Sequence, residues 1–331
     1  MKAIIPVAGM GMRLRPHTYT QPKPLIPVAG KPILGFIVDR LRTAGFDEFV
    51  FVIGYLGEKI EAYISEAYPD IQAHFVSQQT REGLGHAVWL TRNVVGPDEA
   101  IFIALGDTIF EADIEAVLRN EHSTLGVKKV DDPYNFGVAE IGEGGLLTRV
   151  VEKPEIPKSN MALVGLYLIR ESKALFDALG AHIEKGHKTQ GEYHLTDGIQ
   201  QLIRNGVSFN AFKVQNWYDC GKKDILLETN SILLRKAGHV SPLAERFENT
   251  IIVPPVAIAD SARIAHSIIG PNVTIGDNTE VLYSVVESSI IGNYTKLEHI
   301  VLHDSVIGSD TSITGLRHNL NIGDNTEIDL S

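Results

Sequence analysis

A six-residue repeat in its C-terminal part constrains the fold of this 331-residue chain more than any other feature of the sequence. From about Thr250 onward, the segments IADSAR, IGPNVT, IGDNTE, IGNYTK and IGSDTS follow one another, each beginning with Ile. An aliphatic residue at every sixth position lets short strands stack as a triangular parallel coil with the aliphatic side chains inside. The spacing is interrupted between Val281 and Ile291 and between Ile313 and Ile322, where we expect loops.

The residues before this repeat have a different pattern, in which apolar runs alternate with amphipathic stretches. Strands are expected at residues 3–8 and in EFVFVIG, IQAHFVS and AIFIALGD, with helices at 33–44, 58–68 and 86–93. This alternation predicts an α/β domain with a mostly parallel, doubly wound sheet, whose ligands bind at the carboxyl ends of the strands. The sequence thus predicts two domains, at residues 1–239 and 250–331.

Composition excludes several classes of protein. The formal net charge of -11 argues against a surface built for nucleic acid, which requires a broad basic face. No apolar run approaches the roughly 20 residues that span a bilayer, and the start of the chain does not resemble a secretory signal. The single cysteine, Cys220, cannot form an internal disulfide. We expect a cytoplasmic enzyme or binding protein without nucleic-acid or membrane partners.

The opening segment AGMGMRLRP places a glycine-rich turn directly after the first expected strand, which is typical of phosphate binding. A dinucleotide-binding turn would carry a third glycine where Leu14 stands, and a Walker loop would require Gly-Lys-Ser/Thr. A third interpretation fits better. The backbone at Gly9 and Gly11 approaches a triphosphate, Arg13 supplies a guanidinium fork, and Lys23 supplies a point charge.

The segment AGMGMRLRPHTYTQPKPLIPVAGKPI resembles the signature of the sugar-1-phosphate nucleotidyltransferases. The resemblance continues through SQQTREGLGHAV, LGD, NFGVAEI, VVEKP, NMALVGLYLI, GEYHLTDGIQ and WYDCG, and so covers nearly all of residues 1–239. It implies a Rossmann-like, doubly wound mixed sheet. The repeat that follows resembles a left-handed parallel β-helix, as in the long-form glucose-1-phosphate thymidylyltransferase branch of the family.

The resemblance also implies a set of site residues. For the triphosphate and the chemical step it implies Gly9, Gly11, Arg13 and Lys23, with Gln78 and Gly83 at the base and Lys153 at the sugar phosphate. For the sugar it implies Gly137, Glu152, Lys153, Asn160, Gly165, Tyr167 and Glu192. For Mg²⁺, which prefers oxygen ligands and keeps several waters, it implies Asp107 and Asp219. The histidines, among them His86 and His194, show no metal-binding spacing and are assigned no function.

These residues predict the reaction of glucose 1-phosphate with dTTP or UTP to give the nucleotide sugar and pyrophosphate. Thymine and uracil differ by one methyl group, which discriminates weakly, so both triphosphates stay open. A mannose-1-phosphate guanylyltransferase, another pyrophosphorylase of nucleotide sugars and a non-catalytic sugar-nucleotide sensor are the alternatives. Met12 stands where the family usually has Thr, which removes one hydroxyl from the phosphate loop.

The repeat also raises the alternative of a second, acetyl-transferring site, because some relatives combine the two activities. The repeat here is short and ends near Ser331, with no obvious arm to cover acetyl-coenzyme A. Coils of this kind leave apolar faces and an open end, which a second copy commonly covers. We therefore expect a homo-oligomer in which the coil mediates assembly and stabilises the catalytic domain without performing chemistry.

Overall fold

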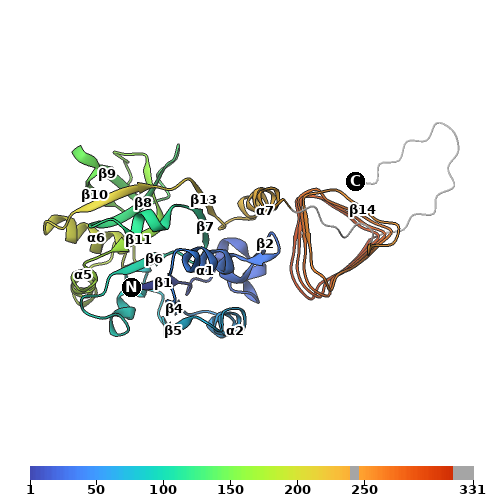
Figure 1. Ribbon diagram of the computed structural model, residues 1–331, viewed down its shortest axis with the longest axis horizontal. Coiled ribbons are helices and arrows are strands. Elements are labelled where there is room, and N and C mark those ends of the chain that lie inside the picture. The colour runs from blue at the N-terminus through green and yellow to red at the C-terminus, as the bar shows by residue number, and fades with distance from the viewer. Residues whose placement is uncertain (239–245, 316–331) are drawn as a thin grey trace. The chain divides into compact units, whose positions relative to one another are not determined.

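The computed structural model describes residues 1–238 and 246–315 (Figure 1). The chain divides into two compact units. The first comprises Met1–Pro27 and Lys31–Leu226, and the second comprises Val28–Gly30 and the residues from Leu227 onward. Within the described residues, no helix is both long enough and apolar enough to cross a membrane.

Parallel strands form the centre of the sheet in the first unit. The elements of this part are β1 (Lys2–Pro6), α1 (Ile33–Thr43), β4 (Glu48–Ile53), α2 (Gly57–Ala67), β5 (Gln72–Ser77), α3 (Leu84–Leu90) and β6 (Ile101–Ala104). β1 pairs in parallel with β4 and β6, and β4 pairs in parallel with β5. The four central residues of β4 are all buried, although neighbouring residues of a strand point to opposite faces, so both faces of the sheet are covered.

The sheet changes direction beyond β6. The remaining strands of this sheet are β8 (Ser123–Lys129), β9 (Val138–Ile141), β10 (Leu147–Val151), β11 (Met161–Ile169) and β12 (Phe209–Lys213). β11 pairs antiparallel with β6, β8 and β9, which gives the path β10-β9-β11-β6-β1-β4-β5. β8 branches from β11, and β12 pairs in parallel with β8. The sheet is therefore mixed. Its parallel half contains the strands that alternate with helices in the sequence.

The other strands and α-helices of the described residues before the coil lie outside this sheet. They are β2 (Pro27–Val28), β3 (Lys31–Pro32), β7 (Thr108–Glu111), α4 (Ile114–Leu118), α5 (Ser172–Glu184), α6 (Leu195–Arg204), β13 (Asn216–Asp219) and α7 (Lys223–Ala237). β7 and β13 pair antiparallel outside the main sheet, and their register places Asp219 opposite Thr108. This small ribbon positions Asp107, which immediately precedes β7 and which the sequence resemblance assigns to a metal site.

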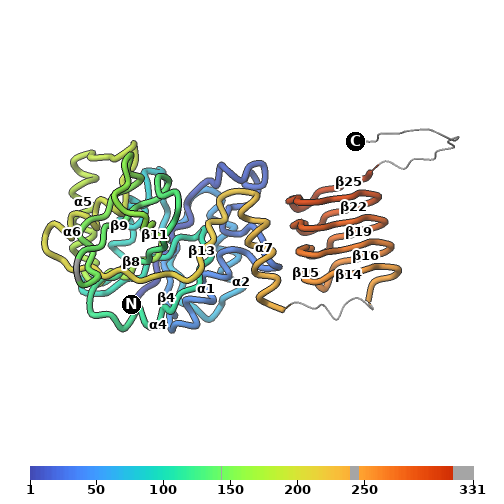
Figure 2. Tube along the Cα trace, turned by 90° about the horizontal axis from the view of Figure 1, so that it is seen from above, coloured from blue at the N-terminus to red at the C-terminus, as the bar shows by residue number. Residues whose placement is uncertain are grey.

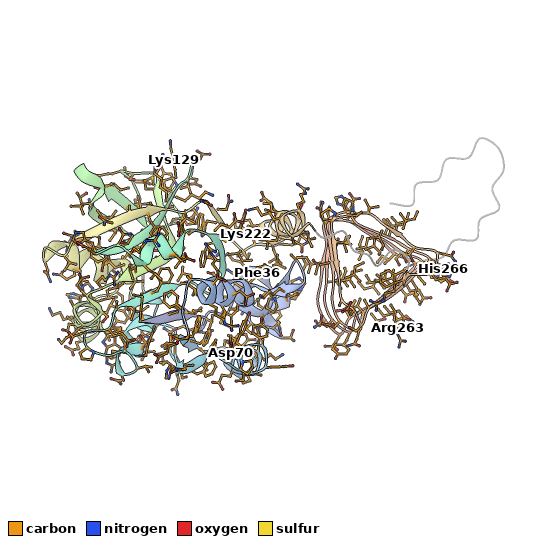
Figure 3. All side chains as sticks on the ribbon, in the orientation of Figure 1. Phe36, Asp70, Lys129, Lys222, Arg263 and His266 are labelled. Carbon is orange, nitrogen blue, oxygen red and sulfur yellow. The ribbon has the colours of Figure 1, made fainter. Side chains whose placement is uncertain are left out.

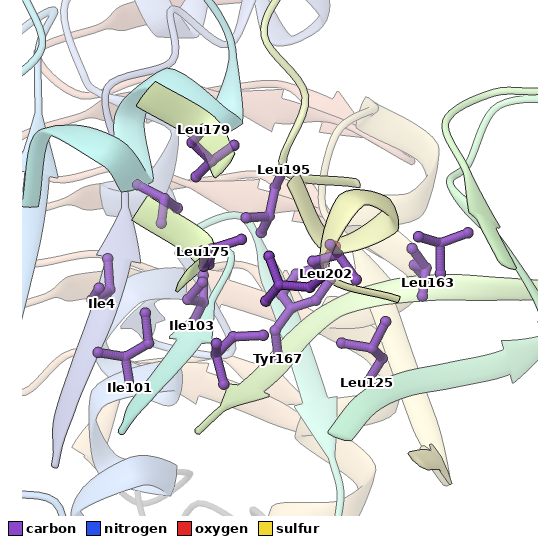
Figure 4. Close-up of a cluster of buried hydrophobic side chains, with 14 of the residues drawn as sticks. Ile4, Ile101, Ile103, Leu125, Leu163, Tyr167, Leu175, Leu179, Leu195 and Leu202 are labelled. Atoms are coloured by element: carbon purple, nitrogen blue, oxygen red, sulfur yellow. The ribbon is translucent and has the colours of Figure 1, made fainter. Parts of the chain in front are cut away.

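A large apolar core lies between the sheet and the helices α5 and α6 (Figure 4). Leu175 and Leu179 of α5 and Leu195 and Leu202 of α6 are at most 1% exposed. These side chains face strand residues such as Ile103 in the same cluster. Burial of apolar surface stabilises a fold by about 25 cal/mol per Å². A core of this extent therefore makes the sheet and its helices a rigid support for the loops at the strand ends.

Three parallel four-stranded sheets form the triangular coil of the second unit, the left-handed β-helix that the repeat predicts (Figure 1). The first sheet comprises β14 (Ile251–Ile252), β17 (Ile268–Ile269), β20 (Val285–Val286) and β23 (Val301–Leu302). The second comprises β15 (Val256–Ile258), β18 (Val273–Ile275), β21 (Ile290–Ile291) and β24 (Val306–Ile307). The third comprises β16 (Arg263–Ala265), β19 (Glu280–Leu282), β22 (Lys296–Glu298) and β25 (Ser312–Thr314). Successive turns of the coil lie one above another (Figure 2).

The inward positions of the coil do not keep a strict six-residue spacing. Ile264 pairs with Val281 and Val281 with Leu297, so one turn takes seventeen residues and the next sixteen. Val286 is buried in the core between Val281 and Ile291, one residue earlier than a six-residue step would place it. The loop expected between Val281 and Ile291 is therefore wrong, because five-residue steps keep the coil continuous. The second expected loop, before Ile322, lies mostly beyond the described residues.

Candidate active site

A pocket of about 830 Å³ lies at the carboxyl ends of β1, β5 and β6 in the first unit. This volume falls in the range of pockets that bind small molecules and cofactors, roughly 300–1,000 Å³. Eight of the residues implied by the sequence line it: Gly9, Gly11, Arg13, Lys23, Gln78, Gly83, Asp107 and Glu192. Segments more than 180 residues apart in the chain thus meet at the edge of the sheet where ligands of doubly wound folds bind.

The glycine-rich turn forms one end of the pocket. Gly11 has a φ of 61°, and a Cβ there would lie 2.9 Å from both Lys23 Cβ and Thr18 Cγ2, so only glycine fits. A Cβ on Gly9 would meet no atom within 4 Å, which leaves open space beside the backbone. Met12 starts a 3-10 turn, and its side chain is 66% exposed. The turn therefore offers bare backbone toward the pocket.

Lys23 connects the two acidic residues of the site. Its Nζ lies 2.6 Å from Asp107 Oδ2 and 3.6 Å from Asp219 Oδ1, and its side chain is only 9% exposed. Arg13 Nη2 lies 3.9 Å from Asp219 Oδ2, and its side chain is 60% exposed. The β7–β13 ribbon brings the two carboxylates together, and the backbone N–H of Cys220 donates to Asp107 O at 3.2 Å.

The donor set at this point suits a hard divalent cation. Two carboxylates face one ammonium, which shows that the space between them accepts positive charge. Across residues 1–238 and 246–315, no cluster of three or more His, Cys, Asp or Glu side chains could enclose a metal. Mg²⁺ needs only one or two protein carboxylates, because waters and substrate phosphates complete its octahedron. Asp107 and Asp219 therefore fit Mg²⁺ better than a metal that requires a full protein cage.

Gln78 and Gly83 also line the pocket. Gln78 is 5% exposed, and its Nε2 donates to Gly83 O at 3.1 Å. Gly83 has a φ of 105°, and a Cβ there would lie 2.6 Å from Tyr193 O. The neighbouring hydrogen bonds from Tyr193 N to Glu82 O and from Gly85 N to Tyr193 O fix this loop. Glycine is required here for both its dihedral angles and its close backbone contact.

Glu152 and Gly137 lie together near α6. Thr196 Oγ1 donates to Glu152 Oε2 at 3.1 Å, and a Cβ on Gly137 would lie 3.1 Å from the same oxygen. Lys153 is exposed and has a φ of 37°, an uncommon conformation for a residue other than glycine. Backbone strain of this kind clusters at functional sites. Asn160 is exposed, and neither it nor Lys153 lines the pocket.

Gly165 and Tyr167 lie behind the pocket wall on β11. A Cβ on Gly165, whose φ is 82°, would lie 2.6 Å from Leu105 Cδ1, and Leu105 lines the pocket. Tyr167 is 4% exposed and belongs to the apolar core, where burial raises the pKa of its phenol. Of the residues implied for the sugar, only Glu192 is part of the pocket lining.

The sequence interpretation missed several residues that line the pocket, notably Arg81, Leu105 and Gly221. Arg81 adds a third cation, and a Cβ on Gly221 would lie 2.7 Å from Arg13 Nη2. Arg81 and Gly221 stand inside two of the matched segments, SQQTREGLGHAV and WYDCG. Their positions within these segments were the only signal that could have identified them.

A family model described as nucleotidyl transferase matches residues 2–236. The bifunctional protein GlmU of Methanocaldococcus jannaschii is 35% identical over 269 residues, which are 80% of this chain but only 61% of that relative's length. A glucose-1-phosphate thymidylyltransferase of Streptomyces griseus is 29% identical over 331 residues, covering 96% of this chain and 90% of its own. A UDP-glucose pyrophosphorylase solved with UDP-glucose shares the fold, with a TM-score of 0.62 and 24% identity over 71% of this chain and 98% of its own.

Proposed function

The chain belongs to the nucleotidyl transferase family, and on that basis we propose that it converts glucose 1-phosphate and dTTP or UTP into the nucleotide sugar and pyrophosphate. The observation that carries the proposal is the pocket itself. Its lining combines bare glycine backbone, Arg13 and Lys23, which we assign to the phosphates, with Gln78 and Gly83, which we assign to the base. The Streptomyces griseus relative, which is named a glucose-1-phosphate thymidylyltransferase, supports a pyrimidine triphosphate.

In this reaction, an oxygen of the sugar phosphate attacks the α-phosphorus of the triphosphate in line, and the bond to the β-phosphate oxygen breaks. Pyrophosphate leaves with that bonding pair, so no protein nucleophile is needed. The obstacle is the mutual repulsion of two anions, which positioning and fixed positive charge overcome. We assign Arg13 and Lys23 to the triphosphate and Lys153 to the sugar phosphate.

Mg²⁺ would be held by Asp107 and Asp219. When bound, it supplies a Lewis acid that offsets charge on the phosphate oxygens. Lys23, which lies between the two carboxylates, would then be available to the phosphates, because the cation takes over the neutralisation of the acidic pair. Lys23 thus keeps the carboxylates in place before the triphosphate binds.

For the sugar, we assign hydrogen bonds to Glu152, Asn160 and Glu192. The Thr196 hydroxyl fixes the Glu152 carboxylate at 3.1 Å, so one of its oxygens is oriented before substrate binds. Gly137 and Gly165 would act indirectly, since a side chain on either would displace Glu152 or Leu105. Tyr167 would act only through packing, since it belongs to the core.

Pyrophosphate release across a matrix of triphosphates and sugar 1-phosphates tests this function. The proposal predicts turnover with glucose 1-phosphate and dTTP or UTP in the presence of Mg²⁺. Turnover with GTP and mannose 1-phosphate instead would identify a guanylyltransferase. No turnover with any pair, together with binding of a nucleotide sugar, would identify a sensor.

We also propose that the coil joins two copies of the chain. Ile251, Ile268, Val285 and Val301 follow one another in register on the outside of one sheet of the coil. Ile251 is 60% exposed and Val301 is 76% exposed. A row of exposed aliphatic side chains on a flat sheet is typical of a surface that another copy covers.

A further inference from the structure

The carboxamide of Gln78 is held from inside the protein by two hydrogen-bond partners. Its Nε2 lies 3.1 Å from Gly83 O and 3.2 Å from His86 Nδ1. A backbone carbonyl can only accept, so the Gly83 oxygen identifies the atom facing it as the NH₂ end of the amide. The His86 nitrogen that meets the same NH₂ must then accept as well. Both amide hydrogens of Gln78 are thereby used, and its Oε1 acceptor remains for the pocket that Gln78 lines.

His86 is held so that this acceptor stays in place. It lies on α3, is 8% exposed, and stacks on Trp89 with ring centroids 6.2 Å apart. Its Nε2 faces Glu82, with Oε2 at 3.8 Å. Burial lowers the pKa of His86, so the ring is neutral near pH 7. A neutral ring with its proton on Nε2 presents the Nδ1 lone pair to Gln78.

We propose that His86 is a positioning residue that makes the pocket select uracil and thymine over cytosine. The inference rests on the proposed function in one respect, that the base of the triphosphate lies against Gln78. Uracil and thymine carry a hydrogen on N3, which the Gln78 Oε1 can accept. Cytosine carries a lone pair on N3, which would face the same oxygen with no hydrogen between them. A polar mismatch in a buried site is rejected far more strongly than a missing methyl group.

Protonation of His86 would reverse this selection. A hydrogen on Nδ1 would meet the Gln78 NH₂ donor to donor, so the amide would rotate and present its NH₂ to the base. That rotation would also place Oε1 against Gly83 O, which weakens the site for every base. The negative charge of Glu82 raises the pKa of His86. The charges of Lys188 and Arg92 lower it, and burial lowers it most. Selection for uracil is therefore expected to persist at pH 6.5, the ordinary pKa of histidine, and to weaken only as the pH falls through the lowered pKa of His86.

The test is calorimetric binding of UTP and of CTP, each with Mg²⁺, to the full chain and two variants. His86→Leu removes the acceptor, and His86→Asn keeps an oxygen near the place of Nδ1. The wild type should prefer UTP by at least about tenfold. His86→Leu should lose most of that preference, whereas His86→Asn should retain it to within about threefold. His74→Asn is the control, since His74 lies on β5, pairs with Glu48 and does not line the pocket.

Three outcomes would overturn the inference: an equal affinity of the wild type for UTP and CTP, an unchanged preference in His86→Leu, or an equal loss of preference in His74→Asn. Thermal unfolding identifies a variant that fails to fold. In that event the variant that folds is compared with the wild type, because His86→Leu must lose the preference and His86→Asn must keep it. Binding is independent of turnover. An enzyme that prefers UTP through His86 but releases no pyrophosphate would contradict the proposed function and leave the inference standing.

Discussion

The Nζ of Lys23 lies 2.6 Å from the Oδ2 of Asp107, in a side chain that is almost completely buried. Asp219 reaches the same ammonium from the other side. One cation thus bridges two carboxylates that lie far apart in the chain and that the β7–β13 ribbon brings together. The ammonium offsets part of the charge of this acidic pair, to which we assign Mg²⁺.

Asp107→Asn and Asp219→Asn should each lower kcat/KM by about 100-fold or more, because each removes a negative ligand from a hard cation. The variants should remain folded, since asparagine keeps the shape of the side chain. Turnover measured against Mg²⁺ concentration checks this. Asp177→Asn is the matched control, because Asp177 is exposed on α5 and pairs with Lys173. Unchanged turnover at limiting Mg²⁺ in either variant would remove that residue from the proposed metal site.

Two glycines of the phosphate loop should respond differently to a methyl group. Gly9→Ala should fold normally, because its Cβ meets no protein atom, but should raise the KM for the triphosphate about tenfold or more by filling the space beside the phosphates. Gly11→Ala should lower the free energy of unfolding by about 1–3 kcal/mol, because of its positive φ and its contacts with Lys23 and Thr18. Urea unfolding and steady-state kinetics of both variants separate the effects. A Gly9→Ala enzyme with an unchanged KM would place the phosphates elsewhere.

Stability should fall as the pH drops below about 6.5. Burial lowers the pKa of both His17 and His86 in the folded state. Below the ordinary histidine pKa of about 6.5, the unfolded chain therefore binds protons that the folded chain does not, and the free energy of unfolding decreases. Urea unfolding at pH 7.5, 6.5 and 5.5 measures how steeply the free energy of unfolding falls as the pH drops. This fall should be shallower in His17→Asn. His187→Asn, an exposed histidine, serves as the comparison, and equal slopes in the two variants would refute the prediction for His17.

The proposed assembly through the coil predicts that Val301→Asp lowers the oligomeric state. Val301 is 76% exposed, so the charge should not disturb folding, but it would be costly to bury against a second copy. Light scattering on the full chain gives the mass. Arg263→Glu is the control, because Arg263 lies on the outside of a different sheet of the coil, beside the inward-facing Ile264 (Figure 3). An unchanged mass in Val301→Asp would exclude this face as the interface.

The sequence predicted those parts of the fold that depend on short-range patterns. The alternation of strands and helices up to β6 was readable because each buried parallel strand is a continuous apolar run. The antiparallel half, in which β11 contacts three strands, depends on pairings between distant segments that no local pattern shows. In the coil, a fixed six-residue step could not anticipate the five-residue steps that bring Val286 and Ile291 into its core.

The sequence likewise predicted only part of the site. Gly9, Gly11, Arg13, Gln78 and Asp107 could be placed from their motifs, because each follows a strand whose end was recognisable. Three features could not be predicted from motifs. They are the contact of Lys23 with both carboxylates, the burial of Tyr167 in the core and the hydrogen bond between Gln78 and His86. These depend on tertiary packing. His86 stands inside the matched segment SQQTREGLGHAV, but nothing in that segment indicates its contact with Gln78.

The most direct test of the proposed reaction uses glucose 1-phosphate labelled with oxygen-18 at its non-bridging phosphate oxygens, together with unlabelled UTP or dTTP and Mg²⁺. If the sugar phosphate attacks the α-phosphorus, mass spectrometry should find all of the label in the nucleotide sugar and none in the pyrophosphate, with the two products in equal amounts. Label in the pyrophosphate, or no product with either triphosphate, would contradict the proposed function.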